Sequence, residues 1–364
     1  MKFSVQKRRI TIDHPVMQMG YAARDHMSEG IHDDCYATLV WIENREPLLI
    51  ACFDLLGGTE SFAAGIRKAI STAVGIDGNR VLVCYSHTHG FVHTIGEDDL
   101  APGAGITVSL SAPQNHDVDF PDLTADLAYA RTLFTLAGEM AAACRDSLIS
   151  GRIVHRRTSS RFGISRRKTL PDGTTVMAPN DDDSLMDDTV DILSLEDTSG
   201  ELHALLWNYA CHPTTCASKN YLITADYPGG VRRALEAAYP GVIPVFLQGC
   251  GADVRPRATC DGAHFRSFTP EEMTEASKTL AADITAALAG PGRVLDVSLA
   301  CLFDPIRLYA EDRDRAWWQA PVRRRAASDP EPRPGTAWWR RCPGRCRRPR
   351  RGSRSAYSRE PPAE

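Results

Sequence analysis

The chain has 364 residues, which is enough for one large domain or two smaller ones, and 43% of them are apolar, as in ordinary folded proteins. No apolar run approaches the length of a membrane-spanning helix, and no apolar segment follows the basic residues 1–9, so we expect neither a transmembrane segment nor a secretory signal. The 11 cysteines are scattered and several lie in apolar runs (Cys52, Cys84, Cys250), which favours buried thiols in a cytoplasmic protein.

The formal charge of −4 hides an asymmetry along the chain. Residues 321–364 hold 13 Arg, no Lys and 4 acidic residues, a net charge of +9, which leaves −13 for residues 1–320. Such an acidic folded part argues against nucleic acid as its partner. The tail also lacks Leu, Ile, Met and Phe, so it cannot supply a core.

We therefore expect a folded domain over residues 1–310, incomplete at its C-terminal end, and a disordered Arg- and Pro-rich tail over residues 311–364. Basicity that comes from arginine alone, with Pro, Gly, Ala and Trp, is typical of GC-rich DNA read out of frame. We hypothesise a frameshift near residues 310–320. The alternative is a genuine basic tail that binds an anionic surface or nucleic acid.

Predicted strands and helices alternate along residues 10–300. Apolar and β-branched runs predict strands over residues 10–13, 36–42, 48–55, 80–85, 190–195, 204–210 and 242–248. Apolar residues at helical spacing predict helices over residues 59–74, 122–148 and 270–288, the last after a capping box at Thr269. A further helix through Val231, Leu235 and Ala238 is predicted after residues 226–230. Residues 91–120 read as a long loop beside the site. This order predicts an α/β (mixed α+β) fold in which helices flank central mixed β-sheets.

Polar turns follow three of the predicted strands. Ser86-His87-Thr88-His89-Gly90 follows residues 80–85, His212-Pro213 follows residues 204–210, and a glycine-rich turn follows residues 242–248. Ligands of open α/β sheets gather beyond strand ends, and imidazole is the commonest metal ligand. Grouping His87, His89 and His212 at one rim predicts a zinc site at the strand ends; the alternative is a set of solvated histidines.

A catalytic zinc takes three protein ligands and lowers the pKa of a bound water to about 7. With two histidines as ligands, a third ligand is missing, and we expect a carboxylate. Cys211 and Cys216 rank lower because their spacing is not that of a zinc finger. Asp54 either supports the site from behind or is a solvated or capping residue. The basic stretch of residues 156–168 either grips an anionic group, such as a carboxylate or an oxyanion, or forms a solvated hairpin; the second reading is favoured.

Four motifs occur in a fixed order: Ser86-His87-Thr88-His89-Gly90, Asn208-Tyr209-Ala210-Cys211-His212-Pro213-Thr214, Ala225-Asp226-Tyr227-Pro228-Gly229 and Phe246-Leu247-Gln248-Gly249-Cys250-Gly251-Ala252-Asp253-Val254. Together they resemble the N-terminal catalytic domain of neutral/alkaline non-lysosomal ceramidases and their shorter bacterial relatives, over roughly residues 10–300. These enzymes are zinc amidases that split the N-acyl bond of ceramide into sphingosine and a fatty acid.

The resemblance implies a role for each matching residue. His87 and His212 would be zinc ligands. His89 would polarise the amide carbonyl or steady its oxyanion, and Arg166 would help to bind the substrate at the reacting end. The implied function is a zinc-dependent amidohydrolase that acts on a small-molecule or lipid N-acyl amide.

The sequence also departs from the family. Gly90-Phe91-Val92 stands where the family has Ser-Gly-Pro, and Arg255 stands where the longer ceramidases have a serine. No motif after residue 300 matches the Glu and Tyr that complete the family's zinc shell. Two alternatives follow: a hydrolase of another amide or ester on the same scaffold, or a catalytically inactive ceramidase-like binding protein.

Overall fold

The computed structural model describes residues 1–21, 23–100, 123–182, 185–296 and 298–304. The chain divides into two compact units, one of residues 1–168 and 178–310 and the other of residues 169–177 and 311–364. The predicted tail and residues 101–120 of the predicted loop, including His116, lie outside the described residues. Within the described part, no helix combines the length and apolarity needed to cross a bilayer.

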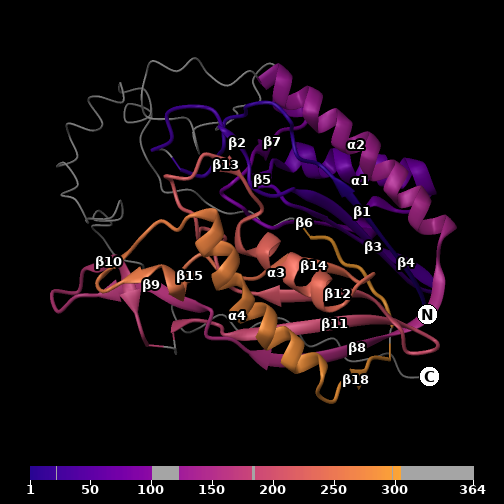
Figure 1. Ribbon diagram of the computed structural model, residues 1–364. Coiled ribbons are helices and arrows are strands. Elements are labelled where there is room, and N and C mark those ends of the chain that lie inside the picture. Colours follow the sequence, from indigo (N-terminus) through magenta and orange to yellow (C-terminus); the bar gives the residue numbers. More distant parts are fainter. Residues whose placement is uncertain (22, 101–122, 183–184, 297, 305–364) are drawn as a thin grey trace, which may run out of the picture. The chain divides into compact units, whose positions relative to one another are not determined.

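A nine-stranded mixed sheet organises the larger unit (Figure 1). Its order is β14-β12-β11-β8-β1-β3-β4-β6, with β18 beside β8. The strands are β1 (Lys2–Arg9), β3 (Tyr36–Asn44), β4 (Glu46–Phe53), β6 (Val81–Tyr85), β8 (Ile149–Ser159), β11 (Thr189–Asp197), β12 (Leu202–Tyr209), β14 (Ile243–Gln248) and β18 (Arg293–Val294). The mixed α+β class predicted from the sequence is confirmed.

The sheet consists of two halves that meet at β1 and β8. We call β1, β3, β4 and β6 the N-terminal half-sheet and β8, β11, β12 and β14 the C-terminal half-sheet. Only two residue pairs of β1 and β8 join them, Lys2 with Ser150 and Phe3 with Ile149. Each half ends in a parallel pair, β4 with β6 and β12 with β14, while its other neighbouring strands are antiparallel.

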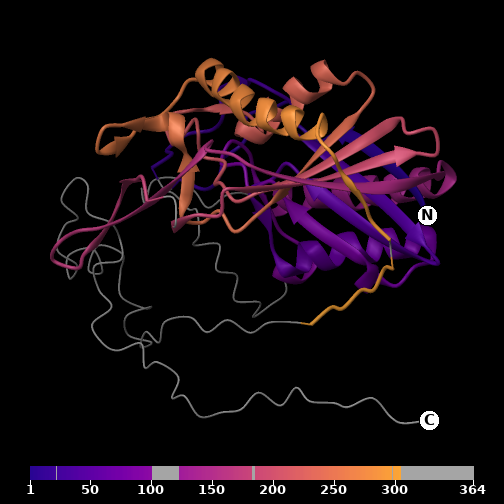
Figure 2. The same ribbon diagram turned by 90° about the horizontal axis from the view of Figure 1, so that it is seen from below.

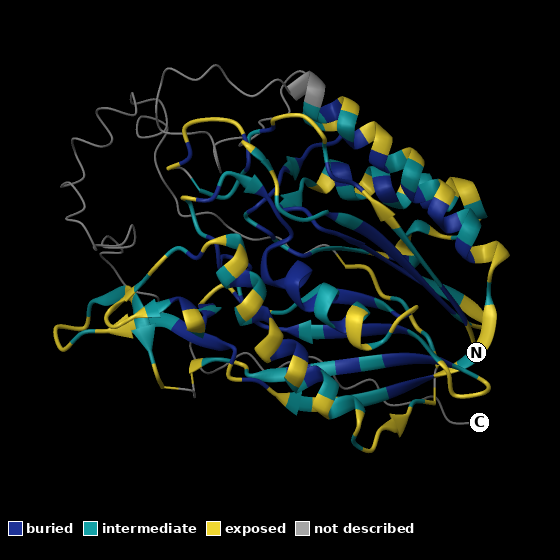
Figure 3. Ribbon diagram, in the orientation of Figure 1, coloured by how far each residue is buried: buried dark blue, intermediate teal, exposed yellow. Residues whose placement is uncertain are grey.

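Helices cover the outer face of each half-sheet. Helices α1 (Glu60–Val74) and α2 (Leu123–Asp146) pack on the N-terminal half, and α3 (Asp226–Ala238) and α4 (Pro270–Leu288) pack on the C-terminal half. Figure 2 shows the two helical layers on opposite sides of the strands. The strands beneath the helices are mainly buried or half-buried, whereas the helices also carry exposed residues (Figure 3). A third apolar cluster lies between the half-sheets and includes Val40 and Ile50 from one and Leu206 and Val245 from the other. Each such side chain contributes about 1.5–3 kcal/mol when fully buried.

The predicted helices are all present, and α1 and α4 agree closely because their ends carry local signals, whereas α3 begins at Asp226, in the stretch predicted to precede it. Thr59 caps α1, since its Oγ1 accepts a hydrogen bond from Phe62 N at 3.1 Å. The capping box of α4 is present, with Thr269 and Glu272 bonded to each other's backbone N–H groups. Helix α2 begins and ends within two residues of its predicted bounds.

The strand predictions needed three corrections. The basic N-terminus forms β1, and residues 10–13, predicted as a strand, lie beyond its end. The polar stretch that starts at Val154 is not a solvated hairpin at its beginning, because β8 lies inside the sheet between β1 and β11. Strand β6, predicted to be buried, forms an edge, and Leu82 is 50% exposed.

The cysteine predictions are borne out in part: Cys52 is buried as expected, whereas Cys250 is exposed.

Short elements complete the described residues. They are β2 (Gly30–Ile31), β5 (Gly57–Gly58), β7 (His93–Thr94), β9 (Gly163–Thr169), β10 (Thr175–Asn180), β13 (Leu222–Ile223), β15 (Val254–Pro256), β16 (Cys260–Asp261) and β17 (His264–Phe265), with 3₁₀ turns at Gly78–Arg80, Glu97–Leu100 and Arg257–Thr259. Of the smaller unit, residues 169–177 are described. They turn at Gly173, whose φ of 80° suits glycine.

Candidate metal centre at the strand ends

Three histidine side chains converge where β6 and β12 end. His87 Nε2 lies 3.1 Å from His212 Nε2, and His89 Nε2 lies 2.9 Å from the same atom. His87 and His89 follow β6 in the N-terminal half-sheet, and His212 follows β12 in the C-terminal half-sheet. The structure thus brings together the three histidines that the sequence pointed to, across 123 residues or more of chain.

The His87 turn is held by the end of β4. His87 N donates to Leu55 O at 3.0 Å, and Nδ1 lies 2.7 Å from Leu56 O. A proton on Nδ1 satisfies that carbonyl and leaves the Nε2 lone pair free, as metal-ligating histidines require. His87 has a left-handed backbone (φ 62°), an uncommon conformation for a residue other than glycine.

The turn at His212 depends on close backbone contacts with the loop after β14. His212 N donates to Val254 O at 3.0 Å. A Cβ atom added to Gly251 would lie 2.7 Å from Cys211 N, so only glycine fits there. This close packing of backbone explains why small residues occupy the glycine-rich turn after β14.

A buried arginine, Arg24, anchors the turn that carries His89. Its side chain is 2% exposed, and its guanidinium donates to four backbone carbonyls, those of Met19, His89, Ala217 and Asn220. The bond to His89 O is 2.5 Å long. Burial lowers the pKa of Arg24. The guanidinium therefore ties the His89 backbone to the loop that follows His212.

A buried carboxylate, Asp226, organises the loop after His212. It is also 2% exposed, and it accepts hydrogen bonds from the N–H and hydroxyl of Thr215 and from the N–H groups of Cys216 and Tyr227. Burial raises its pKa, although these hydrogen bonds oppose the rise. Asp226 also has a left-handed backbone (φ 54°).

Burial opposes protonation of His89 and His212. The pKa of His212 is lowered to about 3 by burial, by His87 and by Arg166. The pKa of His89 is lowered well below its usual value by burial and by the other two histidines. Neutral imidazole is the form that binds a metal. Backbone atoms of Gly20 and Gly251 lie beside His89 and His212 respectively, and a Cβ on Gly20 would lie 2.3 Å from His89 Nδ1.

The donor set fits a zinc ion. Two nitrogen ligands of one tetrahedral zinc lie about 3.3 Å apart, since each Zn–N bond is about 2.0–2.1 Å long. The observed separations of 2.9 and 3.1 Å are close to that value. When the ring protons of His87 and His89 are on Nδ1, only His212 has a proton to place among the three Nε2 atoms, so their lone pairs face one another. A cation would instead accept all three lone pairs. No carboxylate of the described residues joins this group of three.

Two arginines and a tyrosine border the cluster. Arg166, on β9, is partly buried, and its Nε has no hydrogen-bond partner. Arg255, on β15, donates to Thr214 O at 3.0 Å, and its Nε is likewise buried without a partner. The ring of Tyr21 lies 4.8 Å from that of His89. Sequence reasoning selected Arg166 but gave no site role to Tyr21, Arg24 or Asp226. Nothing local marks Tyr21 and Arg24, and Asp226 was noted only as part of a family motif.

The other residues considered for the metal site, Cys211, Cys216 and Asp54, do not belong to it. Burial raises the pKa values of the Cys211 and Cys216 thiols, which disfavours the thiolate that a metal needs. Asp54 is not solvated: it forms a buried ion pair of 2.6 Å with Arg232. Burial alone would lower the pKa of Arg232, but Asp54 and Asp33 raise it above its usual value.

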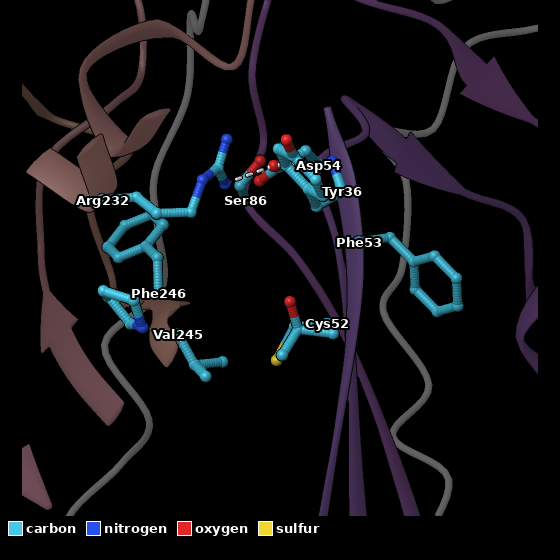
Figure 4. A pocket seen from close by; sticks show the side chains of 10 residues that line it. Tyr36, Cys52, Phe53, Asp54, Ser86, Arg232, Val245 and Phe246 are labelled. Atoms are coloured by element: carbon cyan, nitrogen blue, oxygen red, sulfur yellow. Dashed lines mark hydrogen bonds and ion pairs between the residues drawn. The ribbon is translucent and has the colours of Figure 1, made fainter. Parts of the chain in front are cut away.

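The pair of Asp54 and Arg232 lies beside a cavity of about 20 Å³, with room for about one water molecule. Figure 4 shows Tyr36, Cys52 and Asp54 of the N-terminal half facing Val245, Phe246 and Arg232 of the C-terminal half. None of the three histidines lines this cavity. Its size excludes a substrate.

The fold is similar to two solved structures. One is neutral ceramidase from Pseudomonas aeruginosa, with a TM-score of 0.60, and the other is a ceramidase complexed with C2, with a TM-score of 0.62. Both are 19% identical in sequence, and each match covers 79% of this chain. The chain matches 44% and 43% of those chains, so it spans less than half of their length. At this identity the likeness confirms the ceramidase fold that the four motifs implied. No protein-family model and no curated protein matches the sequence.

Proposed function

We propose that this protein is a zinc-dependent hydrolase that cleaves an N-acyl amide bond with water. The convergence of His87, His89 and His212 Nε2 atoms at the strand ends of a ceramidase-like fold supports this proposal more than any other observation. In the reaction, the oxygen of water is added to the acyl carbon, the C–N bond breaks, and the leaving nitrogen takes up a proton.

His87 and His212 are the proposed zinc ligands. Zinc at this point would acidify a water molecule and polarise the scissile carbonyl. The protein's part is to orient the His87 imidazole, because Leu56 O accepts from its Nδ1, and to oppose protonation of His212 by burial.

His89 has two candidate tasks. As a hydrogen-bond donor it would steady the oxyanion of the acyl group, as the family resemblance implies. As a third ligand it would complete a three-histidine shell, the minimum of a catalytic zinc site. Its Nε2 at 2.9 Å from His212 Nε2 favours the ligand role in this chain.

The test is the zinc content of the purified full chain and of alanine variants at His87, His89 and His212. We expect about one zinc per chain in the unchanged protein and loss of at least 90% of it in each variant. The control is His155→Ala, because His155 lies in β8 and bonds to Asp191, away from the cluster. Full zinc occupancy in His87→Ala or His212→Ala would refute the ligand assignment. Full occupancy in His89→Ala with lost amide hydrolysis would assign His89 to the oxyanion.

A further inference from the structure

Arg166 and Arg255 lie together on one face of a two-stranded ladder. Strands β9 and β15 are antiparallel, and Arg255 pairs with Ile164. Arg166 is two residues beyond Ile164 and so lies on the same face, diagonal to Arg255. Diagonal neighbours are about 7–8 Å apart at Cα, within reach of long side chains.

Neither arginine forms an ion pair with a carboxylate among the residues described, although Asp253 lies close enough to Arg166 to raise its pKa. Asp253, the acid nearest in sequence, forms its ion pair with Arg167 at 2.6 Å. Arg255 instead donates to Thr214 O and lies over the ring of Phe265, with 4.8 Å from the guanidinium carbon to the ring centroid. Neighbouring like charges in a sheet are destabilising, so an unmatched arginine pair needs another reason to be there.

Unsatisfied polar atoms point to a missing ligand. The Nε atoms of Arg166 and Arg255 and the hydroxyl of Tyr21 are all buried without a hydrogen-bond partner. All three groups interact electrostatically, and burial lowers the pKa of Arg166 and raises that of Tyr21 to about 12. Buried donors in native proteins are normally paired, so three beside one another indicate a site for an acceptor.

The arginine pair also adjoins the histidine cluster. His212 N is bonded to the carbonyl of Val254, the residue before Arg255. Arg255 donates to the carbonyl of Thr214, two residues after His212. Both arginines contribute to lowering the pKa of His212. An anionic group bound by Arg166 and Arg255 would therefore lie close to an amide bound at the histidines. One substrate molecule would carry both groups.

We infer that Arg166, Arg255 and Tyr21 form a carboxylate-binding subsite, and that the substrate is an N-acyl amide whose amine part carries a carboxylate, as in an N-acyl amino acid. This inference rests on the proposed function for the hydrolysis but not for the binding. Guanidinium groups match carboxylates in shape and donor number. A neutral amide such as ceramide offers this pair no anion.

The test uses two ligands that differ only in charge, N-octanoylglycine and N-octanoylglycinamide. Calorimetry on chelator-treated full chain measures binding without turnover. We expect the acid to bind at least tenfold more tightly than the amide. Arg255→Ser should reduce this preference to about twofold or less. Arg257→Ser is the matched control, because Arg257 forms an ion pair with Asp181, and it should keep the preference.

Hydrolysis by the zinc-loaded chain separates the two proposals. A preference for the acid in kcat/KM that Arg255→Ser removes, chiefly through KM, supports both. Binding of the acid that depends on Arg255, with no hydrolysis of either ligand, would refute the proposed function and keep the subsite. Equal binding of acid and amide, unchanged in Arg255→Ser, would overturn the subsite even if both ligands are hydrolysed.

Discussion

The two histidine turns are built at equivalent places by opposite means. The turn after β6 carries His87 and His89, and a buried cation, Arg24, binds its backbone carbonyl. The turn after β12 carries His212, and a buried anion, Asp226, binds the backbone N–H groups that follow it. Each charged side chain forms hydrogen bonds with backbone groups that have no partner within the turn, because a buried turn has no water to supply them.

The two devices also depend on each other. Arg24 and Asp226 line the same small space behind His89, and the charge of Asp226 raises the pKa of Arg24 against the effect of burial. Arg24 reaches Ala217 O and Asn220 O in the loop that Asp226 organises. The comparison shows that two buried charged side chains, Arg24 and Asp226, position the site through hydrogen bonds to the backbone of the two turns. The histidines do not hold the turns in place themselves.

The largest expected effect comes from removing the cation. Arg24→Met leaves four buried or partly buried backbone carbonyls without their arginine donor and removes the positive charge near Asp226, so we expect the free energy of unfolding to fall by about 3–5 kcal/mol. Urea unfolding of the zinc-free protein measures this. The control is Arg131→Met, which removes an exposed ion pair with Glu97 and should leave the free energy of unfolding almost unchanged. Equal effects in the two variants would contradict the anchoring role.

Removing the anion should have a somewhat smaller effect. Asp226→Ala deprives three backbone N–H groups and one hydroxyl of their acceptor, while the loop keeps its bonds to Arg24, so we expect a loss of about 2–3 kcal/mol. A double-mutant cycle with Arg24→Met sharpens the comparison. Coupled charges should give a non-additive term of about 0.5–3 kcal/mol, and strict additivity would mean that the two turns are independent.

The smallest expected effect concerns backbone conformation. Among the residues described, four other than glycine have a positive φ: Arg45 in the exposed β3–β4 turn, and His87, Ala217 and Asp226 at the site. Glycine adopts this conformation without strain but loses more entropy on folding, so Arg45→Gly and Ala217→Gly should each stabilise the protein by about 0.5 kcal/mol. Thermal unfolding measures both. A clear loss of stability in Ala217→Gly alone would show that its methyl group has a packing role at the site.

The sequence predicted those parts that depend on near neighbours. Helices α1 and α4 carry both their apolar spacing and their caps locally, so their bounds agree with the structure. Helix α3 has the spacing but no side-chain cap, and its start at Asp226 was missed. The histidine cluster could be predicted because each member directly follows an apolar strand, and strand ends meet at one rim.

The rest depends on contacts between distant residues. Arg24 bonds to residues 65 to 196 positions away, and no local pattern reveals those partners. Strand β1 was missed because its basic residues obscure an alternation that only the neighbouring strands β3 and β8 make meaningful. Arg255 stood out in the sequence only as a departure from the family, and its pairing with Arg166 required the register of β9 and β15.

The placement of the histidines on different half-sheets has a consequence for cooperativity. His87 and His89 belong to the half with the α1 and α2 core, and His212 to the half with the α3 and α4 core. An ion held by both would add a cross-link between two cores that already share two β1–β8 residue pairs, an apolar interface and polar contacts such as the Asp54–Arg232 ion pair. Its binding energy would oppose separation of the halves and couple their local unfolding. Hydrogen exchange in β4 and β12 would then slow together on metal addition. The metal would stabilise the fold in addition to its role in the reaction.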